Sequence, residues 1–407
     1  MLPPRFAAAA ATLVAAALLL TGCGGTGTTG SDALTFWVYE PNSKAQKDTL
    51  DALIAKFEKE NDVDVKTTYI PKDGFNTKLN SSIAVGKNPD VSYLDQPLIS
   101  KFADDGLLLD VTKDLSAGIG SDSFYPGAMD TATVDGTVYG VPVSMTTAAL
   151  FYNKALVASP PTTWDEWVSS ARKVYAPDQI AAFEGIGAGG YGAWLFPALV
   201  QSAGGAMVNE DATKTTFGEK PAIEAADLLV TLQGYSDQGI RQSQNAFGNG
   251  LIAYKISGPW DIEALQTNFP DLDFGVAPIP AKTGFDSISN IGGENLVIYK
   301  NSAKPDLAYK LVEYLTNPTG DAIMAGVTGN FATNIAAAES LDYTADPYLS
   351  AFATQLQTAV GRPTLNDWLK VNDEVIGAAL DEILVSGGKP SEVLPAASKH
   401  ADQILFG

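Results

Sequence analysis

The residues that could carry chemistry in this chain are carboxylates, amides and aromatic rings, because thiols and imidazoles are almost absent. The 407 residues include 47 Asp and Glu, 15 Tyr and 6 Trp, but one cysteine, Cys23, and one histidine, His400. A disulfide within the chain is impossible. A Cys/His zinc site, an iron–sulfur cluster or a Ser-His-Asp triad is not expected. We therefore expect no metal and no cofactor, and we place His400 on an exposed helix.

The excess of acidic residues excludes a further class of partner. Lys and Arg number 26, the net charge is −21, and no basic cluster occurs along the chain. Proteins that bind nucleic acid need clustered Lys and Arg to neutralise phosphates, so nucleic acid is not an expected partner. An apolar fraction of 45% in 407 residues is enough for two or three globular units with buried cores.

Alternating strand and helix patterns predict where functional side chains meet. Residues 34–39, 63–70 and 91–94 read as strands, and residues 44–60 carry apolar side chains at helical spacing. Strand–helix–strand alternation predicts a mostly parallel sheet with helices on both faces. Ligands of such sheets bind beyond the carboxyl ends of the strands. The loops after the first and third of these strands are therefore the first places to look for a site.

Two later segments indicate which tryptophans are structural and which lies at a strand end. Thr163 to Glu166 forms a capping box, and the helix that it starts places Trp164 and Trp167 in structural positions. Residues 251–256 read as a buried strand that stops at a Gly-Pro pair, so Trp260 comes out at the strand end.

The first residues predict export. An apolar run of about 15 residues is too short to span a bilayer and fits a signal peptide over residues 1–22. It ends in Leu-Thr-Gly-Cys, which resembles the lipobox of bacterial lipoproteins, with Cys23 as the lipidated residue (diacylglycerol and palmitate). Residues 23–32 then form a flexible tether. The alternative is an ordinary secretory signal with a chance cysteine. We expect the mature protein to be lipid-anchored on the extracytoplasmic face of the cell membrane.

The chain behind this leader resembles the extracellular solute-binding lipoproteins of carbohydrate ABC importers, the group that includes maltose-binding protein. The resemblance rests on the order and spacing of four runs: Gly86–Asp95, Asp135–Lys154, Ile256–Pro280 and Gly292–Ile298. It implies an α/β fold of the type II periplasmic-binding class, with two lobes that are each a mostly parallel sheet flanked by helices. The implied lobes are residues 33–142 with 280–330, and 143–279 with 331–407. The hinge between them is crossed more than once.

The resemblance implies a non-catalytic receptor that closes on a neutral mono- or oligosaccharide between the lobes. Aromatic faces would cover the sugar's C–H patches, and carboxylates, amides or Arg would bind its hydroxyls. Thr146 stands where relatives often carry an acid, and Glu294 stands where they commonly carry Trp or another residue. The expected ligand-binding residues are Trp37, Tyr39, Glu40, Asp95, Gln96, Thr146, Tyr191, Trp194, Trp260, Gly293, Glu294, Arg362 and Trp368.

Several alternatives stay open at this point. Asp95 could cap a helix, Glu40 could be solvated, and Arg362 could form a surface ion pair. The protein could also be a secreted, lipid-anchored glycoside hydrolase, which needs only two suitably spaced carboxylates. Other possibilities are a receptor for a non-sugar solute or one that feeds a membrane sensor. The expected partners are the permease subunits of an ABC importer with their cytoplasmic ATPase, and the expected state is a monomer.

Overall fold

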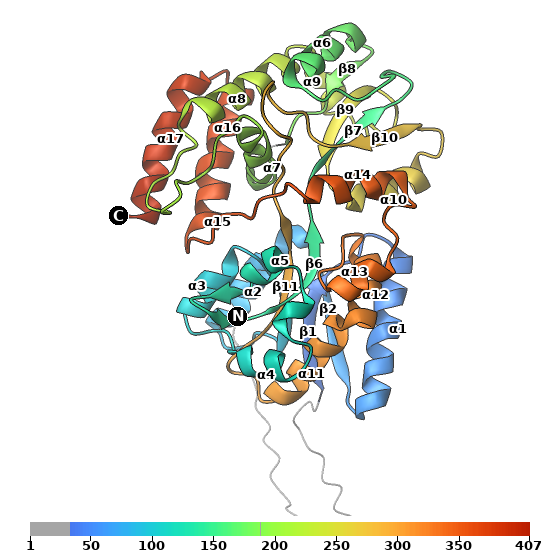
Figure 1. The fold of residues 1–407 in the computed structure, drawn as a ribbon, viewed down its shortest axis with the longest axis vertical. Coiled ribbons are helices and arrows are strands. Elements are labelled where there is room, and N and C mark those ends of the chain that lie inside the picture. Colours follow the sequence, from blue (N-terminus) through green and yellow to red (C-terminus); the bar gives the residue numbers. More distant parts are fainter. Residues whose placement is uncertain (1–32, 188) are drawn as a thin grey trace, which may run out of the picture. The chain divides into compact units, whose positions relative to one another are not determined.

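The computed structural model describes residues 33–187 and 189–407, which are built around two separate β-sheets (Figure 1). The signal peptide, Cys23 and the tether lie outside the described residues. The sheet of the first lobe has the strand order β2 (Val65–Ile70), β1 (Leu34–Tyr39), β3 (Val91–Asp95), β11 (Gly292–Ile298) and β6 (Val141–Thr146). The sheet of the second lobe has the order β10 (Phe274–Ala277), β7 (Ala149–Asn153), β9 (Ile252–Ser257) and β8 (Ala181–Phe183).

Each sheet is parallel except for one reversed strand. In the first sheet, β1 pairs parallel to both β2 and β3, whereas β11 is antiparallel to β3 and β6. In the second sheet, β8 is parallel to β9, and β7 is antiparallel to β9 and β10. The reversed strands β11 and β7 are those that enter a sheet directly from the other lobe, with no helix in between. The predicted α/β fold with mostly parallel sheets is thus confirmed.

Helices cover the two sheets. The first lobe carries α1 (Lys44–Asn61), α2 (Lys72–Ala84), α3 (Leu98–Asp104), α4 (Thr112–Ala117), η1 (Ser121–Ser123), α5 (Pro126–Asp130), α11 (Pro305–Thr316), α12 (Pro318–Thr328) and α13 (Ile335–Ser340), with a small ribbon of β4 (Thr133–Val134) and β5 (Thr137–Val138). The second lobe carries α6 (Trp164–Val174), α7 (Gly189–Gln201), α8 (Lys220–Gln233), α9 (Gln238–Arg241), α10 (Trp260–Asn268), α14 (Pro347–Leu356), α15 (Trp368–Lys370), the π-helix η2 (Val371–Ile376), α16 (Gly377–Leu384) and α17 (Pro390–Leu405).

Local sequence explains why these helices form and which face they bury. In α1 the residues spaced at i, i+3, i+4 and i+7, from Leu50 to Phe57, are all buried against the first sheet. The predicted capping box at Thr163 starts α6, and Trp164 and Trp167 are buried in the core of the second lobe. His400 is exposed on α17, as expected. Within the part of the chain described, no helix combines the length and the apolar character that a membrane span requires.

The chain passes between the lobes three times within the described residues, and the connecting segments are bonded to one another. The passages lie between β6 and β7, between β10 and β11, and between α13 and α14. Thr147 Oγ1 of the first passage donates to the Asn290 carbonyl of the second at 2.9 Å, and Ser289 Oγ donates to the Ala148 carbonyl at 3.0 Å. Beside them, Met145 and Phe331 exchange backbone hydrogen bonds of 3.0 and 2.8 Å, where Phe331 lies between α12 and α13. β6 (Val141–Thr146) continues past residue 142, where the first lobe was expected to end. The lobe limits given from the sequence stay a prediction.

Candidate functional site

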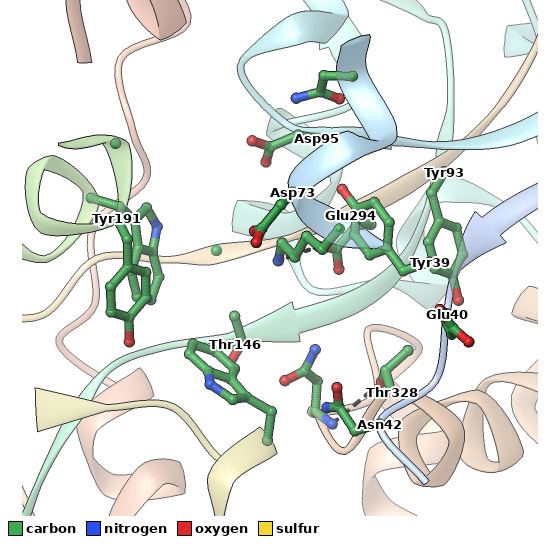
Figure 2. A pocket seen from close by; sticks show the side chains of 18 of the residues that line it. Tyr39, Glu40, Asn42, Asp73, Tyr93, Asp95, Thr146, Tyr191, Glu294 and Thr328 are labelled. Atoms are coloured by element: carbon green, nitrogen blue, oxygen red, sulfur yellow. Dashed lines mark hydrogen bonds and ion pairs between the residues drawn. The ribbon is translucent and has the colours of Figure 1, made fainter. Parts of the chain in front are cut away.

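A cavity of about 500 Å³ lies at the carboxyl ends of the first sheet and is lined by residues of both lobes. Tyr39, Asp95 and Thr146 are the last residues of β1, β3 and β6. These three strands run in the same direction, so their ends meet at one edge of the sheet and bring the three side chains to the cavity (Figure 2). This is the position at which open α/β sheets bind ligands.

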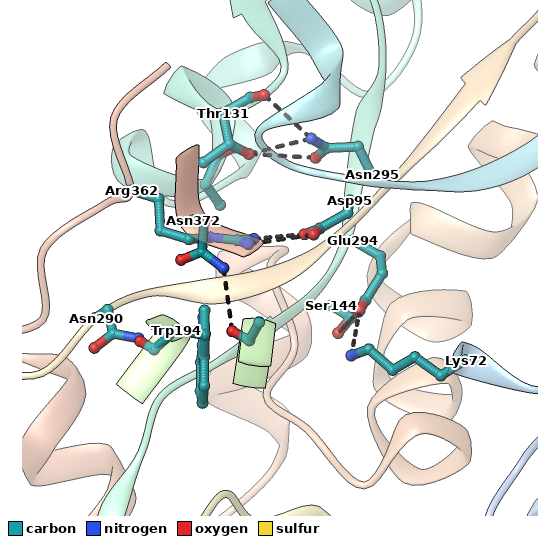
Figure 3. A network of polar contacts seen from close by, with 12 residues as sticks. Lys72, Asp95, Thr131, Ser144, Trp194, Asn290, Glu294, Asn295, Arg362 and Asn372 are labelled. Atoms are coloured by element: carbon teal, nitrogen blue, oxygen red, sulfur yellow. Dashed lines mark hydrogen bonds and ion pairs between the residues drawn. The ribbon is translucent and has the colours of Figure 1, made fainter. Parts of the chain in front are cut away.

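The first-lobe side of the cavity is a polar wall built by strand register. On β11, Glu294 lies opposite Asp95 of β3 and opposite Ser144 of β6. The Ser144 hydroxyl donates to Glu294 Oε2 at 2.9 Å, and Lys72 Nζ lies 3.3 Å from Glu294 Oε1 (Figure 3). Asn330 Nδ2 donates to the Ser144 hydroxyl at 3.1 Å. Glu294 is only 5% exposed, so its carboxylate is held in one orientation at the cavity wall.

Gly293 makes this close approach possible. Its φ is +143°, a conformation that residues with a side chain rarely adopt. A Cβ at this position would lie 2.0 Å from the Ser144 carbonyl oxygen. The glycine therefore acts through its backbone, because it lets β11 come near enough to β6 for the bond between Ser144 and Glu294.

An ion pair joins the polar wall to the segment between α14 and α15 of the second lobe. Arg362 donates to both carboxylate oxygens of Asp95, at 3.2 and 2.5 Å. Their side chains are 11% and 21% exposed, so the pair is well shielded from solvent. The ion pair that was the alternative for Arg362 is therefore present, but it is shielded rather than on the surface, and a ligand contact of Arg362 stays a prediction. The helix-cap alternative for Asp95 is wrong, because α3 has Pro97 at its N-cap and no side-chain cap.

The second-lobe side of the cavity is an aromatic wall of Tyr191, Trp194 and Trp260. The rings of Tyr191 and Trp194, both on α7, stack with centroids 5.9 Å apart and planes at 23°. Trp260 starts α10 and lies 5.9 Å from Trp194 at 51°. A Cβ at Gly258 would overlap the Trp260 ring, so the glycine gives this ring its place. Trp260 is half-buried at the start of α10, which agrees with its expected place at a strand end rather than in a core.

Burial, reinforced by nearby carboxylates, makes the Tyr39 phenol in the cavity harder to ionise. Burial and the nearby carboxylates Glu294 and Asp95 raise the pKa of Tyr39 well above its usual range. The Tyr39 ring packs edge-on against Phe75 and Tyr93, at 4.8 and 5.3 Å. Tyr39 thus presents a neutral hydroxyl, held by ring packing, beside the carboxylates of the polar wall.

Unmet hydrogen-bonding capacity gathers around the same cavity. Four lining residues each have a buried polar side-chain atom without a partner among the described residues: Asn76 Oδ1, Thr146 Oγ1, Asn330 Oδ1 and Arg362 Nε. A buried polar group left unpaired costs about 1–3 kcal/mol, and such groups in native proteins call for a specific cause. A polar ligand that enters the cavity, with a small adjustment of its walls, would remove this cost.

The cavity brings together most of the side chains expected from the sequence and leaves three outside. The residues that line it are Tyr39, Glu40, Asp95, Thr146, Tyr191, Trp194, Trp260, Gly293, Glu294 and Arg362. Trp37 lies two residues before the end of β1 and has Lys78 over its ring at 5.0 Å. Gln96 is buried beside Gly293, and Trp368 is buried in the second-lobe core. None of these three lines the cavity. Glu40 is exposed at the rim.

The structure adds residues that sequence reasoning missed. Lys72 and Asp73 begin α2 just past the end of β2, so the strand-end rule could have found them. Asn330 comes from the segment between α12 and α13, and Asn372 comes from η2, where its Nδ2 donates to the Gly190 carbonyl at 3.1 Å. Neither position carries a sequence signal. No group of three potential metal-ligating side chains occurs within residues 33–187 and 189–407.

Comparison with known proteins places the chain in a family. Residues 41–322 match the family described as bacterial extracellular solute-binding protein, and the chain belongs to it. The chain is 28% identical over 370 residues to the maltodextrin-binding protein of Bacillus subtilis, covering 84% of this chain and 83% of the relative. It is 29% identical over 309 residues to the galactooligosaccharide-binding protein of the same organism, covering 70% and 68%.

The fold of the chain is also similar to that of solved solute-binding proteins. The GacH receptor of Streptomyces glaucescens, solved unliganded and with acarbose, superposes with a TM-score of 0.81 at 25% identity, covering 92% of this chain and 98% of that one. The two-lobed type II binding-protein fold expected from the sequence is confirmed, as is an extracytoplasmic solute-binding protein. Because the family consists of solute-binding proteins, the alternative of a glycoside hydrolase is set aside.

Proposed function

We propose that the protein is a receptor that captures a neutral saccharide between its lobes and delivers it to an ABC importer. The observation that carries this proposal is the pairing of two different walls around one cavity: carboxylates and amides on the first lobe, and three aromatic rings on the second. A sugar ring presents hydroxyls at its edge and C–H patches on its faces. The polar wall suits the hydroxyls, and the aromatic wall suits the faces.

The relatives support a saccharide but not one particular sugar. One is named for maltodextrin, another for galactooligosaccharide, and the solved GacH receptor was studied with acarbose. The ligand contacts that we propose are those of the ten sequence-expected residues that line the cavity. Trp37, Gln96 and Trp368 would act on binding only through the residues they support.

The cellular setting extends the proposal. The family is extracellular, which fits a signal peptide over residues 1–22 and a lipid on Cys23 that holds the mature chain at the outer face of the membrane. The receptor would act as a monomer and meet two permease subunits driven by a cytoplasmic ATPase. A ligand favours closure only by its differential affinity for the closed state.

Isothermal titration calorimetry of the purified protein against glucose, maltose, maltodextrins and galactooligosaccharides tests the proposal. Saturable binding with micromolar or tighter Kd, with the sugar recovered intact by chromatography, is the expected result. If every sugar in the panel gives no heat while the protein shows a cooperative thermal transition, the saccharide assignment is wrong and a different solute must be sought.

A further inference from the structure

A short segment between α14 and α15, residues 361–367, is held at both of its ends by the hinge and the second lobe (Figure 1). Just before it, the Val360 amide donates to the Ser289 carbonyl of the second passage at 2.8 Å. Just after it, Trp368 is 1% exposed in the second-lobe core. Pro363 restricts the backbone between these two attachments. We call residues 361–367 the strap, and because it is already fixed, it loses little freedom when it makes a contact.

Two hydrogen bonds join the strap to α3 of the first lobe. The Ser100 hydroxyl donates to the Thr364 carbonyl at 3.1 Å, and Asn366 Nδ2 donates to Asp104 Oδ2 at 2.6 Å. None of these four residues lines the cavity of about 500 Å³ between the lobes, which we call the main cavity. These two contacts between the lobes therefore do not depend on a ligand.

The ion pair of Arg362 and Asp95 extends this contact to the wall of the main cavity. Arg362 belongs to the strap and Asp95 ends β3, so the two bonds of the pair cross from one lobe to the other (Figure 3). An ion pair with two parallel bonds forms only in a narrow range of orientations. Leu369, two residues after the strap, packs against the first-lobe core, although its neighbour Trp368 is buried in the second-lobe core. The strap and its flank thus meet the first lobe through both polar and apolar contacts.

We propose that the strap is a clasp that holds the two lobes together before any ligand is bound, so that the free protein already populates a closed arrangement. The strap moves with the second lobe, whereas α3 and β3 move with the first, so these contacts are lost when the lobes separate. A receptor that is closed for only a fraction of the time binds its ligand more weakly by that fraction. The clasp therefore raises the apparent affinity for every ligand by one common factor, whatever the chemistry of the ligand. This effect on affinity rests on the proposed function, but the clasp itself does not.

Small-angle X-ray scattering of the ligand-free protein tests the clasp directly. The double variant Asp95→Asn/Arg362→Met removes the ion pair without leaving a lone charge. We expect its radius of gyration to exceed that of the wild type, because the lobes separate more often. The control is Glu224→Gln/Lys282→Met, which removes an ion pair of 2.7 Å between α8 and the segment that follows β10 and should leave the radius unchanged. Equal radii for the wild type and the folded Asp95→Asn/Arg362→Met variant overturn the inference.

Calorimetric titration of Ser100→Ala/Asn366→Ala measures the effect of the clasp on affinity from outside the main cavity. Glucose, maltose, maltodextrins and galactooligosaccharides are the probes. For each sugar that the wild type binds, affinity should fall by the same factor, about threefold to tenfold, because two hydrogen bonds between the lobes are lost. The matched control is Asn301→Ala, which removes an exposed pair of amide hydrogen bonds to Asn88, of 2.8 and 3.0 Å, within the first lobe. It should leave every affinity unchanged.

The outcomes separate this inference from the proposed function. An unchanged affinity in the folded Ser100→Ala/Asn366→Ala variant overturns the clasp, and so do losses that differ from one sugar to another. If no sugar binds, the proposed function is wrong, while scattering by the ligand-free protein still decides whether the clasp exists. Melting temperatures show whether each variant is folded. Scattering is also measured for Ser100→Ala/Asn366→Ala, whose lost contacts are exposed, so the test stands if the ion-pair variant does not fold.

Discussion

The two walls of the main cavity are built in different ways. The polar wall on the first lobe is set by strand register, because Asp95, Glu294 and Ser144 face one another across three adjacent strands. The aromatic wall on the second lobe is set by two helix starts, since α7 carries Tyr191 and Trp194 and α10 begins with Trp260. Strand pairing fixes the distances between the hydrogen-bonding groups of the polar wall. The first turns of two helices instead place aromatic rings with one face toward the cavity.

The contrast indicates a division of labour in the proposed receptor. Direction-dependent contacts to hydroxyls need atoms fixed within the geometry of a hydrogen bond, and a sheet provides that. Stacking tolerates small shifts, so the rings can sit on shorter, separate elements. We expect specificity to come mainly from the first lobe and much of the affinity from the second. The following predictions test that expectation, from the largest effect to the smallest.

The largest expected effect concerns the support behind the polar wall. Asp321 of α12 is fully buried and accepts hydrogen bonds from the backbone of Thr333 and Asn334, both at 2.7 Å, in the segment that follows Asn330. Burial raises its pKa from an ordinary 3.8 to about 7. A folded-state pKa above the unfolded value means that its contribution to stability is present below about pH 4 and is lost as the pH rises through 7. The loss amounts to about 4 kcal/mol.

Urea unfolding of the wild type and of Asp321→Asn, at pH 4, 5.5 and 8, measures this contribution. The wild type should lose more stability than the variant over that range, and the difference between the two proteins removes the pH dependence due to all other carboxylates. Parallel stability curves for the two proteins would contradict the raised pKa.

A somewhat smaller loss of stability is expected when a side chain at position 293 prevents β11 from lying close to β6. Gly293→Ala places a Cβ against the Ser144 carbonyl at a φ that favours glycine, which should cost about 3 kcal/mol of unfolding free energy. Sugar binding should weaken with it, because Glu294 moves. Gly361→Ala is the control, since no atom lies within 4 Å of its added methyl group. Thermal melts of both variants decide the matter, and equal Tm values would show that the strand adapts without cost.

The aromatic wall is tested by Trp260→Ala. Loss of the ring face should weaken sugar affinity more than tenfold, or about 1.4 kcal/mol, with little change in Tm because the ring is half-buried. The control is Trp37→Ala, which removes a tryptophan that lies outside the cavity and should change affinity less than twofold. Unchanged affinity in the Trp260 variant would remove this residue from the site.

The smallest effect is expected for Lys72→Met. The Lys72 side chain is 70% exposed, and an exposed ion pair contributes about 0–1 kcal/mol. Affinity should change less than fivefold, and the change should shrink in 0.5 M salt as the pair is screened. A larger change that salt does not affect would show that Lys72 itself binds the ligand.

Much of this architecture could be predicted because it is encoded locally. The spacing of Leu50 to Phe57 predicts α1, and the Thr163 capping box predicts the start of α6. Tyr39 and Asp95 could be chosen because parallel strands end at one edge of a sheet. Trp37 shares a face of β1 with Tyr39 but lies two residues, about 7 Å, short of that edge. Counting residues back from the strand end would have excluded it.

The remaining site residues depend on long-range structure. Asn330 reaches the cavity because the segment between α12 and α13 pairs Phe331 with Met145 of β6, and no local pattern indicates that pairing. Asn372 lies on a π-helix, which brief apolar periodicity does not predict. Local sequence patterns also do not predict the antiparallel direction of β7. This strand is connected to β6 by two hinge residues and not by a helix.

The aromatic wall also gives the protein a built-in optical reporter. Of its 6 tryptophans, Trp164, Trp167 and Trp368 are buried in the second-lobe core, where a ligand cannot change their surroundings. Trp194 and Trp260 are half-buried and line the main cavity, and their indole rings lie 5.9 Å apart. An occupant of the cavity replaces water at these two rings. Their emission therefore shifts with occupancy, so binding can be followed in the unlabelled protein by its own fluorescence.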